Sequence, residues 1–341
     1  MEEIKLNKLI LHPEFYNTIE ELRKVNVNSS KEPIQMDFDF SFDTFPPNGK
    51  LKLLTKKKQK LDFKNGEILF QSNKLLIGGY DESTWDFMSL EGSAFITSHS
   101  YVLVGKNDYI PINYLTNYFY TRSELISNNN NRLLIFTDDP KSDAKSQYAT
   151  DRSNFLEKYT PENSILFVDG PMIGGQMNHI TREMVECLNL KNISPIFFVK
   201  NSTSNLVTDN VPAFKGKYNS DMHWSSKELA EGEITNFFIY EDQINNKNSK
   251  IFFYFKPFID TSPQRIELHL ETYNFIKSKI MDILDLIYFL ILVNGDKKNP
   301  QIRPIAIAEK YARETLKIID YRKLLKTVGL IPTMNQERGF N

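Results

Sequence analysis

Hydrophobic and polar positions follow two different periods along the first 120 residues. Apolar residues recur at helical spacing over residues 1–30, with an interruption at Pro13, which predicts one or two short helices. From residue 34 to about 120 the pattern changes to short β-rich runs, so we expect an antiparallel meander. The runs cover residues 36–42, 50–54, 68–70, 75–80, 93–105 and 109–112, and turn signals such as Asn65-Gly66 separate them.

The middle of the chain contains two apolar runs without a polar member, at 165–168 and 196–199. Runs of this kind are typical of strands buried on both faces. A helical pattern over 178–190 lies between them, which predicts a β-α-β unit with parallel strands. A polar loop at 127–131, a strand at 133–136 and a helix over 143–159 precede this unit.

The last third of the chain continues to alternate between strands and helices. Strands are expected at 233–240, 250–256 and 264–270. Helices are expected at 221–229, 272–293, 305–316 and 321–328. The fold class predicted by the whole pattern is α/β, with a mixed sheet flanked by helices.

The length and composition suit one large domain with additions at both ends, because 40% of the 341 residues are hydrophobic. We expect residues 1–65 to form an accessory or assembly segment and residues 66–341 to form the main domain. The single cysteine excludes an intramolecular disulfide. The sequence shows neither a signal peptide nor a membrane-spanning run, so we expect a cytoplasmic protein that does not contact membranes.

Charge is almost balanced along the chain, with 42 Lys and Arg against 43 Asp and Glu. No global field therefore attracts a polyanion, and a nucleic acid would have to bind a local patch. One run of lysines offers such a patch, although a solvated loop face explains it equally well. Its members are Lys50, Lys52, Lys56, Lys57, Lys58, Lys60 and Lys64.

Two aspartates stand where an apolar strand gives way to small or polar residues. Asp169 follows the run 165–168 and precedes a glycine and a proline, and Asp81 follows the run 75–80. Ligands of open α/β sheets bind beyond the carboxyl ends of strands, which makes both aspartates candidates for a site. Each one taken alone is also an ordinary turn residue, so both interpretations stay open.

Two further residues are candidates for the same site. Lys200 follows the run 196–199 and, if that strand is parallel to the one ending in Asp169, reaches the same sheet edge. A solvated lysine is the alternative interpretation. The preceding predicted helix carries Asp151 and Glu157, which do not share a face at 3.6 residues per turn. We favour Asp151 as the residue directed at Asp169.

Converging carboxylates suit a divalent cation. Mg²⁺ and Mn²⁺ prefer oxygen ligands, and two such ions can neutralise a scissile phosphate and activate a water. The sequence lacks the His and Cys spacings of zinc sites, the Walker and Rossmann glycine motifs, and the Gly-x-Ser-x-Gly elbow. Phosphodiester hydrolysis is therefore the chemistry that the carboxylates favour.

Five segments in register resemble the NurA family of nucleases, which act beside a HerA-type hexameric ATPase that translocates DNA. They are ILFVDGPM, IFFVKNSTS, SDMHWSSKELAEGEITNFF, IFFYFKPFIDTSPQRIEL and RPIAIAEKYARETLKIIDYRKLL, and the similarity extends from about Leu75 to the C-terminus. The resemblance implies a ribonuclease H-like core, dependence on Mn²⁺ or Mg²⁺, and a homodimer that processes DNA ends. It also implies a HerA-type partner and a role in DNA repair or antiphage defence.

The resemblance assigns roles to single residues. Asp169 matches the family's strand-end aspartate and Asp81 matches its N-terminal aspartate, although Glu82 stands where the family usually has glycine. Asp151 falls where the family has a helix glutamate, and Lys200 matches the family lysine. These four are expected to be catalytic, and the three aspartates are the expected metal ligands.

The C-terminal motif departs most from the family. Gln301 and Glu309 occupy the positions of a tyrosine and a histidine, so Glu309 is either a replacement catalytic ligand or a surface residue. Arg265 and Glu267 are assigned to structure, as an ion pair on one strand. An active deoxyribonuclease is the main hypothesis. The alternatives are a catalytically inactive DNA-binding or assembly subunit of the same complex, and a binding module unrelated to nucleic acid.

Overall fold

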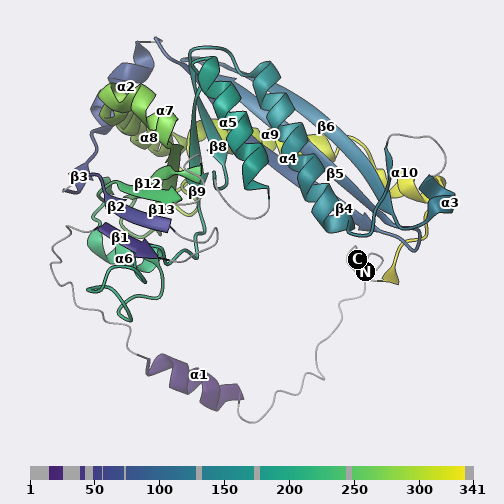
Figure 1. The fold of residues 1–341 in the computed structure, drawn as a ribbon, viewed down its shortest axis with the longest axis horizontal. Helices are drawn as coiled ribbons and strands as arrows, with labels where there is room; N and C mark the ends of the chain where they lie inside the picture. The colour runs from purple at the N-terminus through teal and green to yellow at the C-terminus, as the bar shows by residue number, and fades with distance from the viewer. Residues whose placement is uncertain are drawn as a thin grey trace. The chain divides into compact units, whose positions relative to one another are not determined.

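The computed structural model describes residues 15–25, 39–42, 49–55, 57–72, 74–127, 133–172, 177–242 and 248–334 (Figure 1). The chain divides into two compact units, Met1–Gln35 and Met36–Asn341. The first unit contains α1 (Phe15–Arg23), a helix within the predicted N-terminal arm. The helical positions expected before residue 15, and most of the polar loop at 127–131, lie outside the described residues. A domain boundary between residues 65 and 66 stays a prediction.

A mixed sheet forms the centre of the second unit. Its described strands are, in spatial order, β1 (Asp39–Phe42), β2 (Gly49–Leu53), β11 (Phe238–Asp242), β12 (Lys250–Lys256), β13 (Gln264–His269), β9 (Ser194–Val199), β8 (Ser164–Asp169), β4 (Leu76–Met88), β5 (Ser93–Val104), β6 (Tyr109–Thr121) and β7 (Leu134–Phe136). The short strands β3 (Gln59–Lys60) and β10 (Glu233–Ile234) pair with each other, and β10 also pairs with β12. The predicted mixed α/β fold is confirmed.

Parallel pairing is confined to a few of the described strands. β8 is parallel to both β4 and β9, and β7 is parallel to β6, whereas the other described pairs are antiparallel. The helix between β8 and β9 is α5 (Asn178–Leu190). The predicted parallel β-α-β unit is therefore confirmed.

Strands β4, β5 and β6 form an antiparallel meander, as predicted, but β4 and β6 are longer than the pattern indicated. β4 continues to Met88 instead of residue 80, and β6 continues to Thr121 instead of residue 112. In the extra part of β4, the ring centroid of Trp85 lies 6.4 Å from that of Tyr321 of α10 (Tyr321–Thr327), and Phe87 packs in one cluster with Leu325 of the same helix. A helix near the end of the chain therefore covers this part of the sheet. The sequence pattern did not predict a strand there because the segment contains polar residues.

Residues 68–70 are helical, so the strand predicted there is wrong. They belong to α2 (Phe63–Gln71), whose N-cap Asp62 accepts a hydrogen bond from the backbone N–H of Lys64 at 2.9 Å. Gly66, predicted as part of a turn, lies inside this helix. A Cβ at Gly66 would lie 2.1 Å from the backbone oxygen of Asp285, so glycine is needed for the close packing of α2 on α8 (Ile280–Asn294).

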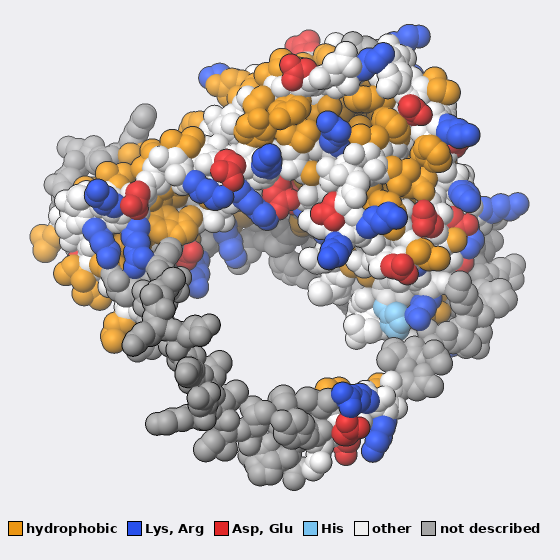
Figure 2. All heavy atoms as spheres, turned by 180° about the vertical axis from the view of Figure 1, so that it is seen from behind, with side chains coloured by type: hydrophobic (Ala, Val, Ile, Leu, Met, Phe, Trp, Pro, Cys, Tyr) orange, Lys and Arg blue, Asp and Glu red, His pale blue; other side chains and the backbone are white. Residues whose placement is uncertain are grey.

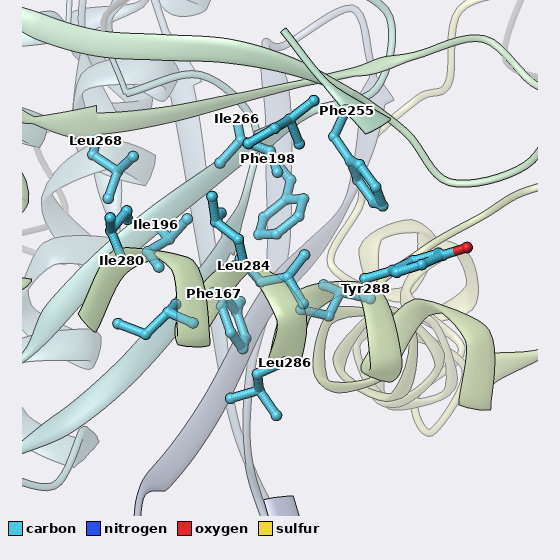
Figure 3. Close-up of a cluster of buried hydrophobic side chains, with 14 of the residues drawn as sticks. Phe167, Ile196, Phe198, Phe255, Ile266, Leu268, Ile280, Leu284, Leu286 and Tyr288 are labelled. Atoms are coloured by element: carbon cyan, nitrogen blue, oxygen red, sulfur yellow. The ribbon is translucent and has the colours of Figure 1, made fainter. Parts of the chain in front are cut away.

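Helices cover both faces of the sheet around β8. On one face, Leu166 and Val168 pack with residues of α4 (Pro140–Tyr159) and α5, which lie side by side (Figure 1). On the other face, Figure 3 shows Phe167 and Phe198 of the sheet close to Leu284 of α8. α9 (Arg303–Leu316) lies over β4 and β5 on this second face. Successive residues of β8 thus face different helical layers.

The other helices complete the C-terminal half. They are α3 (Glu124–Ser127), α6 (Asp221–Glu228), α7 (Leu270–Ile276) and a 3₁₀ helix over Lys277–Lys279. The helix predicted over 272–293 is thus divided among α7, the 3₁₀ turn and α8. In the ranges that the structure describes, every helix is too short or too polar to span a lipid bilayer.

Candidate active site

Strand pairing places Asp81 and Asp169 side by side. Tyr80 of β4 is the parallel partner of Val168 of β8, and each aspartate is the next residue along its strand. Tyr80 and Val168 point into the cluster formed with α4 and α5, so the aspartates that follow them point to the opposite face. Neighbouring strands are only about 4.8 Å apart, and the two carboxylates therefore meet at the end of β8.

The backbone turns away from the sheet directly after Asp169. Gly170 has a φ of +96°, a conformation that residues with a side chain rarely adopt. Its N–H donates to the carbonyl oxygen of Phe198 at 2.8 Å, which fixes the turn to β9. No described atom lies within 4 Å of the position a Cβ would take, so the backbone conformation alone selects glycine.

Lys200 joins the two aspartates from β9. Phe198 is the parallel partner of Asp169, and Lys200, two residues further on, returns to the same face. Its Nζ lies 2.9 Å from Asp169 Oδ2, in an ion pair whose side chains are 25% and 23% exposed. Three of the predicted site residues, Asp81, Asp169 and Lys200, are therefore brought together at one edge of the sheet.

The environment of Asp81 opposes its negative charge. The residue is only 5% exposed. Burial, followed by the charges of Asp169 and Glu82, raises the pKa of Asp81 to about 8, and Lys200 only partly offsets this. The backbone N–H of Glu82 donates to Asp81 Oδ1 at 2.8 Å. A bound cation or proton would relieve the repulsion between these carboxylates.

Glu82 belongs to a buried polar network that the sequence pattern does not single out. Its Oε1 accepts a hydrogen bond from Tyr148 Oη of α4 at 2.6 Å. Burial raises the pKa of Glu82, although the charge of Arg152 and the Tyr148 hydrogen bond oppose the shift. Its Oε2 is buried without a hydrogen-bond partner among the described residues. In the sequence, only its position next to Asp81 could have pointed to Glu82, because Tyr148 and Arg152 lie far along the chain.

Asp151 is buried on α4 but has other partners. Its Oδ1 accepts hydrogen bonds from Gln147 Nε2 at 3.1 Å and from Tyr118 Oη of β6 at 3.4 Å. Burial raises its pKa, and these two hydrogen bonds lower it. Glu157, the alternative helix residue, accepts a hydrogen bond from Ser153 Oγ at 2.8 Å. The described contacts thus do not join either carboxylate to Asp169, and a metal-binding role for Asp151 stays a prediction.

Glu309 lies on α9 in a hollow of about 620 Å³ that also includes Ser83, Lys310 and Arg313 among its lining residues. Ser83 is two residues beyond Asp81 on β4, and therefore on the same face. Glu309 Oε2 accepts a hydrogen bond from Gln301 Nε2 at 2.7 Å, and Oε1 forms an ion pair with Arg313. Glu309 is thus near the candidate site but held by other partners, and its catalytic role stays a prediction.

Asp81, within β4, and Asp169, at the end of β8, offer oxygen donors that suit a hard cation. In the described ranges, no three His, Cys, Asp or Glu side chains are grouped closely enough to hold a metal ion by themselves. Mg²⁺, however, is usually held by one or two carboxylates, with water and substrate phosphates as further ligands. The oxygen donors of Asp81 and Asp169, and the like-charge repulsion recorded in the pKa of Asp81, fit this kind of site.

The predicted lysine patch is partly occupied by acidic neighbours. Lys52 Nζ lies 2.7 Å from Glu241 Oε2, and Lys58 Nζ lies 3.3 Å from Glu233 Oε2. Lys56 lies outside the described residues. Binding of a nucleic acid by this run of lysines stays a prediction.

Solved structures of nucleases share a distant likeness with the chain. The NurA nuclease from Sulfolobus solfataricus is 9% identical, with 75% of this chain and 86% of that chain covered and a TM-score of 0.49. Endonuclease V from Bacillus subtilis is 11% identical, with 76% and 91% covered and a TM-score of 0.39. A NurA bound to dAMP and manganese is 9% identical, with 78% and 90% covered and a TM-score of 0.34. Scores this low carry no argument about function.

The sequence comparison gives the family. No curated protein matches the chain significantly. The NurA domain, in contrast, matches residues 58–314, a range that contains Asp81, Asp169 and Lys200. Because this match covers well over half of the chain, the protein belongs to the NurA family.

Proposed function

We propose that the protein is a deoxyribonuclease that depends on a divalent metal ion. The observation that carries the proposal is the meeting of Asp81 and Asp169 on adjacent parallel strands, with Lys200 paired to Asp169. Membership of the NurA family supports nuclease activity. A ribonuclease H-like core is part of the same proposal.

The carboxylates of Asp81 and Asp169 would hold Mn²⁺ or Mg²⁺. When bound, such an ion polarises the scissile phosphate and lowers the pKa of a coordinated water. The chain belongs to the NurA family, and another NurA has been solved with dAMP and manganese, so Mn²⁺ is the first ion to test. Burial of Asp81 favours metal binding over an exposed, solvated carboxylate, because the ion removes the charge repulsion that burial intensifies.

Lys200 would contact the substrate. Its ion pair with Asp169 is about one-quarter exposed, so the ammonium group is accessible to a phosphate oxygen. A lysine acts on a phosphate as a compact point charge. Figure 2 shows Lys and Arg side chains interspersed with Asp and Glu on the face it presents, so local cations such as Lys200 would have to guide DNA.

The cellular role that we propose is supported by the family and not by the site. We propose that the protein acts as a homodimer with a HerA-type hexameric ATPase, in DNA repair or antiphage defence, in the cytoplasm. Glu309 and Asp151 are retained as further catalytic candidates, although their described hydrogen bonds are to Gln301, Gln147 and Tyr118.

The alternative is a catalytically inactive NurA protein that binds DNA or assembles the complex. The observation that favours it is the placement of Asp151, whose described contacts are with Gln147 and Tyr118 instead of Asp81 and Asp169. The substitution of the C-terminal motif by Gln301 and Glu309 points in the same direction.

A nuclease assay on linear DNA with and without Mn²⁺ tests the proposal. We expect Asp81→Ala and Asp169→Ala to lower the cleavage rate by roughly 100-fold or more, because each removes a proposed ligand of the metal ion that would neutralise the negative charge of the transition state. Asp86→Asn, an exposed carboxylate on the other face of β4, is the matched control and should cut like the parent. Equal cleavage by all three variants would refute the site, and DNA binding without any cleavage by the parent would favour the inactive subunit.

A further inference from the structure

Three charges are buried together on β12 and β13. Glu267 is fully buried, and its Oε1 lies 2.7 Å from Lys250 Nζ and 2.8 Å from Arg265 Nε. Lys250 and Arg265 are 7% and 9% exposed. The ion pair predicted between Arg265 and Glu267 is therefore present, with Lys250 as a third member.

This cluster lies on the face of the sheet opposite the Asp169 carboxylate. Glu267 is the partner of Phe197 on β9, and Phe197 is the partner of Val168 on β8, so the three side chains share one face. Asp169 is the next residue after Val168 and points to the other face. The cluster therefore cannot act on the substrate side directly.

The second oxygen of Glu267 holds the loop that follows Asp169. Oε2 accepts a hydrogen bond from the backbone N–H of Met172 at 2.9 Å. Met172 is 2% exposed and stands three residues beyond Asp169. The same loop is tied to β9 by the hydrogen bond from Gly170 N–H to Phe198. Asp169 is thus followed by a turn with two anchors, one on β9 and one on β13.

The charges explain why the anchor is a carboxylate. Burial alone would raise the pKa of Glu267, but Lys250, Arg265 and the Met172 N–H outweigh it and lower the pKa. The carboxylate is therefore ionised, and a hydrogen bond to an ionised acceptor is about twice as strong as a neutral one. Well-packed apolar residues often stabilise a core at least as well as buried ions, but they cannot accept the Met172 hydrogen bond.

The loop after Lys200 has a similar anchor on the same face. Asp221 is fully buried and accepts hydrogen bonds from the backbone N–H groups of Val207 at 3.0 Å and Thr208 at 2.8 Å. Tyr254 Oη also donates to Asp221, at 3.1 Å, and Tyr254 is the strand partner of Arg265. Both chain segments that leave the candidate site are thus fastened by carboxylates beneath it.

We propose that Glu267 is a positioning residue for the reaction: held by Lys250 and Arg265, it fixes the loop at Met172 and thereby orients the Asp169 carboxylate beside Asp81. The inference rests on the proposed nuclease function. A small error in the placement of a reacting group lowers a rate by as much as about 100-fold, which sets the scale of the effect.

Glu267→Gln in the full chain tests the proposal, because it keeps the shape and removes the charge. The matched control is Asp285→Asn, since Asp285 is also buried and accepts a backbone N–H, that of Asp62, at 2.8 Å in the contact between α2 and α8. We expect both variants to lower Tm. Only Glu267→Gln should lower kcat, by about 10- to 100-fold, and weaken the binding of Mn²⁺ measured by calorimetry, while KM for DNA changes little. A lower Tm with unchanged kcat and unchanged Mn²⁺ affinity would show a purely structural role and overturn the proposal.

A second variant separates positioning from folding. The combination Lys250→Met, Arg265→Leu and Glu267→Leu replaces the buried ions with apolar residues, an exchange that often preserves stability. We expect it to keep a Tm close to that of the parent and still lose kcat, because the acceptor for Met172 is gone. Parental kcat in this variant would overturn the proposal.

The failure of the proposed function can be told apart from the failure of this inference. If the parent neither cuts DNA nor binds Mn²⁺, the nuclease proposal fails, and hydrogen exchange of the backbone around Met172 becomes the readout. Exchange there should be at least about tenfold faster in Glu267→Gln than in the parent and unchanged in Asp285→Asn. Equal exchange in all three proteins would overturn the anchor itself.

Discussion

Asp81 shows at the scale of one residue how burial and neighbouring charge oppose the ionisation of a carboxylate. Its side chain has Asp169 and Glu82 nearby, and its pKa is raised to about 8, first by burial and then by these charges. In water near neutral pH, without a cation, the protonated form would therefore be substantially populated. Metal binding has to displace this proton, so the affinity for Mn²⁺ should increase as the pH rises toward 8.

The same shift predicts a pH-dependent stability of the metal-free protein. The pKa of Asp81 is about 8 in the folded state and near its ordinary value of 3.8 in the unfolded chain. The folded state binds more protons between these values, so the contribution of Asp81 to stability is fully present below about pH 4 and is lost as the pH rises to about 8. Urea unfolding at a series of pH values, in the presence of a chelator, measures how the free energy of unfolding depends on pH.

Asp81→Asn, which resembles the protonated aspartate, should be about as stable as the parent at pH 4 and more stable at pH 8. Asp86→Asn provides the control, because Asp86 is exposed on the same strand. A constant difference in the free energy of unfolding between Asp81→Asn and the parent from pH 4 to pH 8 would contradict the expected titration of Asp81.

At the scale of elements, the ends of β8 and β9 determine where the proposed site lies. Both strands are buried, and each continues directly into a polar residue, Asp169 or Lys200, at the same edge. The turn after β8 depends on Gly170, whose positive φ lets the chain leave the sheet at once. The backbone turn at Gly170 therefore connects the Asp169 carboxylate to the loop that is anchored at Met172.

Gly170→Ala tests this coupling. Because no described atom would contact the new Cβ, the cost comes from the backbone conformation alone, about 1 to 2 kcal/mol in the free energy of unfolding. If the loop relaxes to relieve the strain, Asp169 moves and cleavage falls as well. Gly105→Ala is the control, because Gly105 is not among the glycines with positive φ and the nearest atom to its Cβ would be the backbone oxygen of Asp108, at 3.4 Å. Equal stability and equal cleavage in the two variants would show that the turn tolerates a side chain.

At the scale of the whole molecule, the sheet joins strands from distant parts of the sequence. β2 pairs with β11, and residues from the first quarter of the chain thereby reach the strands that carry the buried ions. Leu51 of β2 is fully buried, and α2 packs on α8. The described residues among 39–65 thus contribute to the same sheet and core as the C-terminal half.

Two truncated proteins test how much of the N-terminal region the fold requires. A protein of residues 36–341 should keep the Tm of the parent within about 2 °C, because residues 1–35 form a separate compact unit. A protein of residues 66–341 should lose more than about 5 °C, because it lacks β2 and the N-cap of α2. Thermal unfolding by circular dichroism measures both. Similar Tm values for the two proteins would support a domain boundary near residue 65 instead.

The sequence by itself determined the elements in which apolar residues are buried and polar residues stand at the ends. The runs 165–168 and 196–199 hold no polar residue, so they had to be buried strands, and the helix between them made the strands parallel. Asp169 and Lys200 were identified because they interrupt those runs. Asp81 was identified in the same way after the run 75–80, the family resemblance assigned both aspartates to one site, and the match over residues 58–314 agrees with the family that the resemblance named.

Only the tertiary structure decided which elements lie against one another. Residues 68–70 belong to a helix that packs on α8 through Gly66. Asp151 is hydrogen-bonded to Tyr118 because of the orientation of α4 on β6. The contacts of Glu82 with Tyr148, and of Glu267 with Met172, join residues that are far apart in the sequence. Periodicity specifies which side of an element is buried, but the partner that covers it is set by packing of the whole chain, and the placement of the acidic side chains depends on that partner.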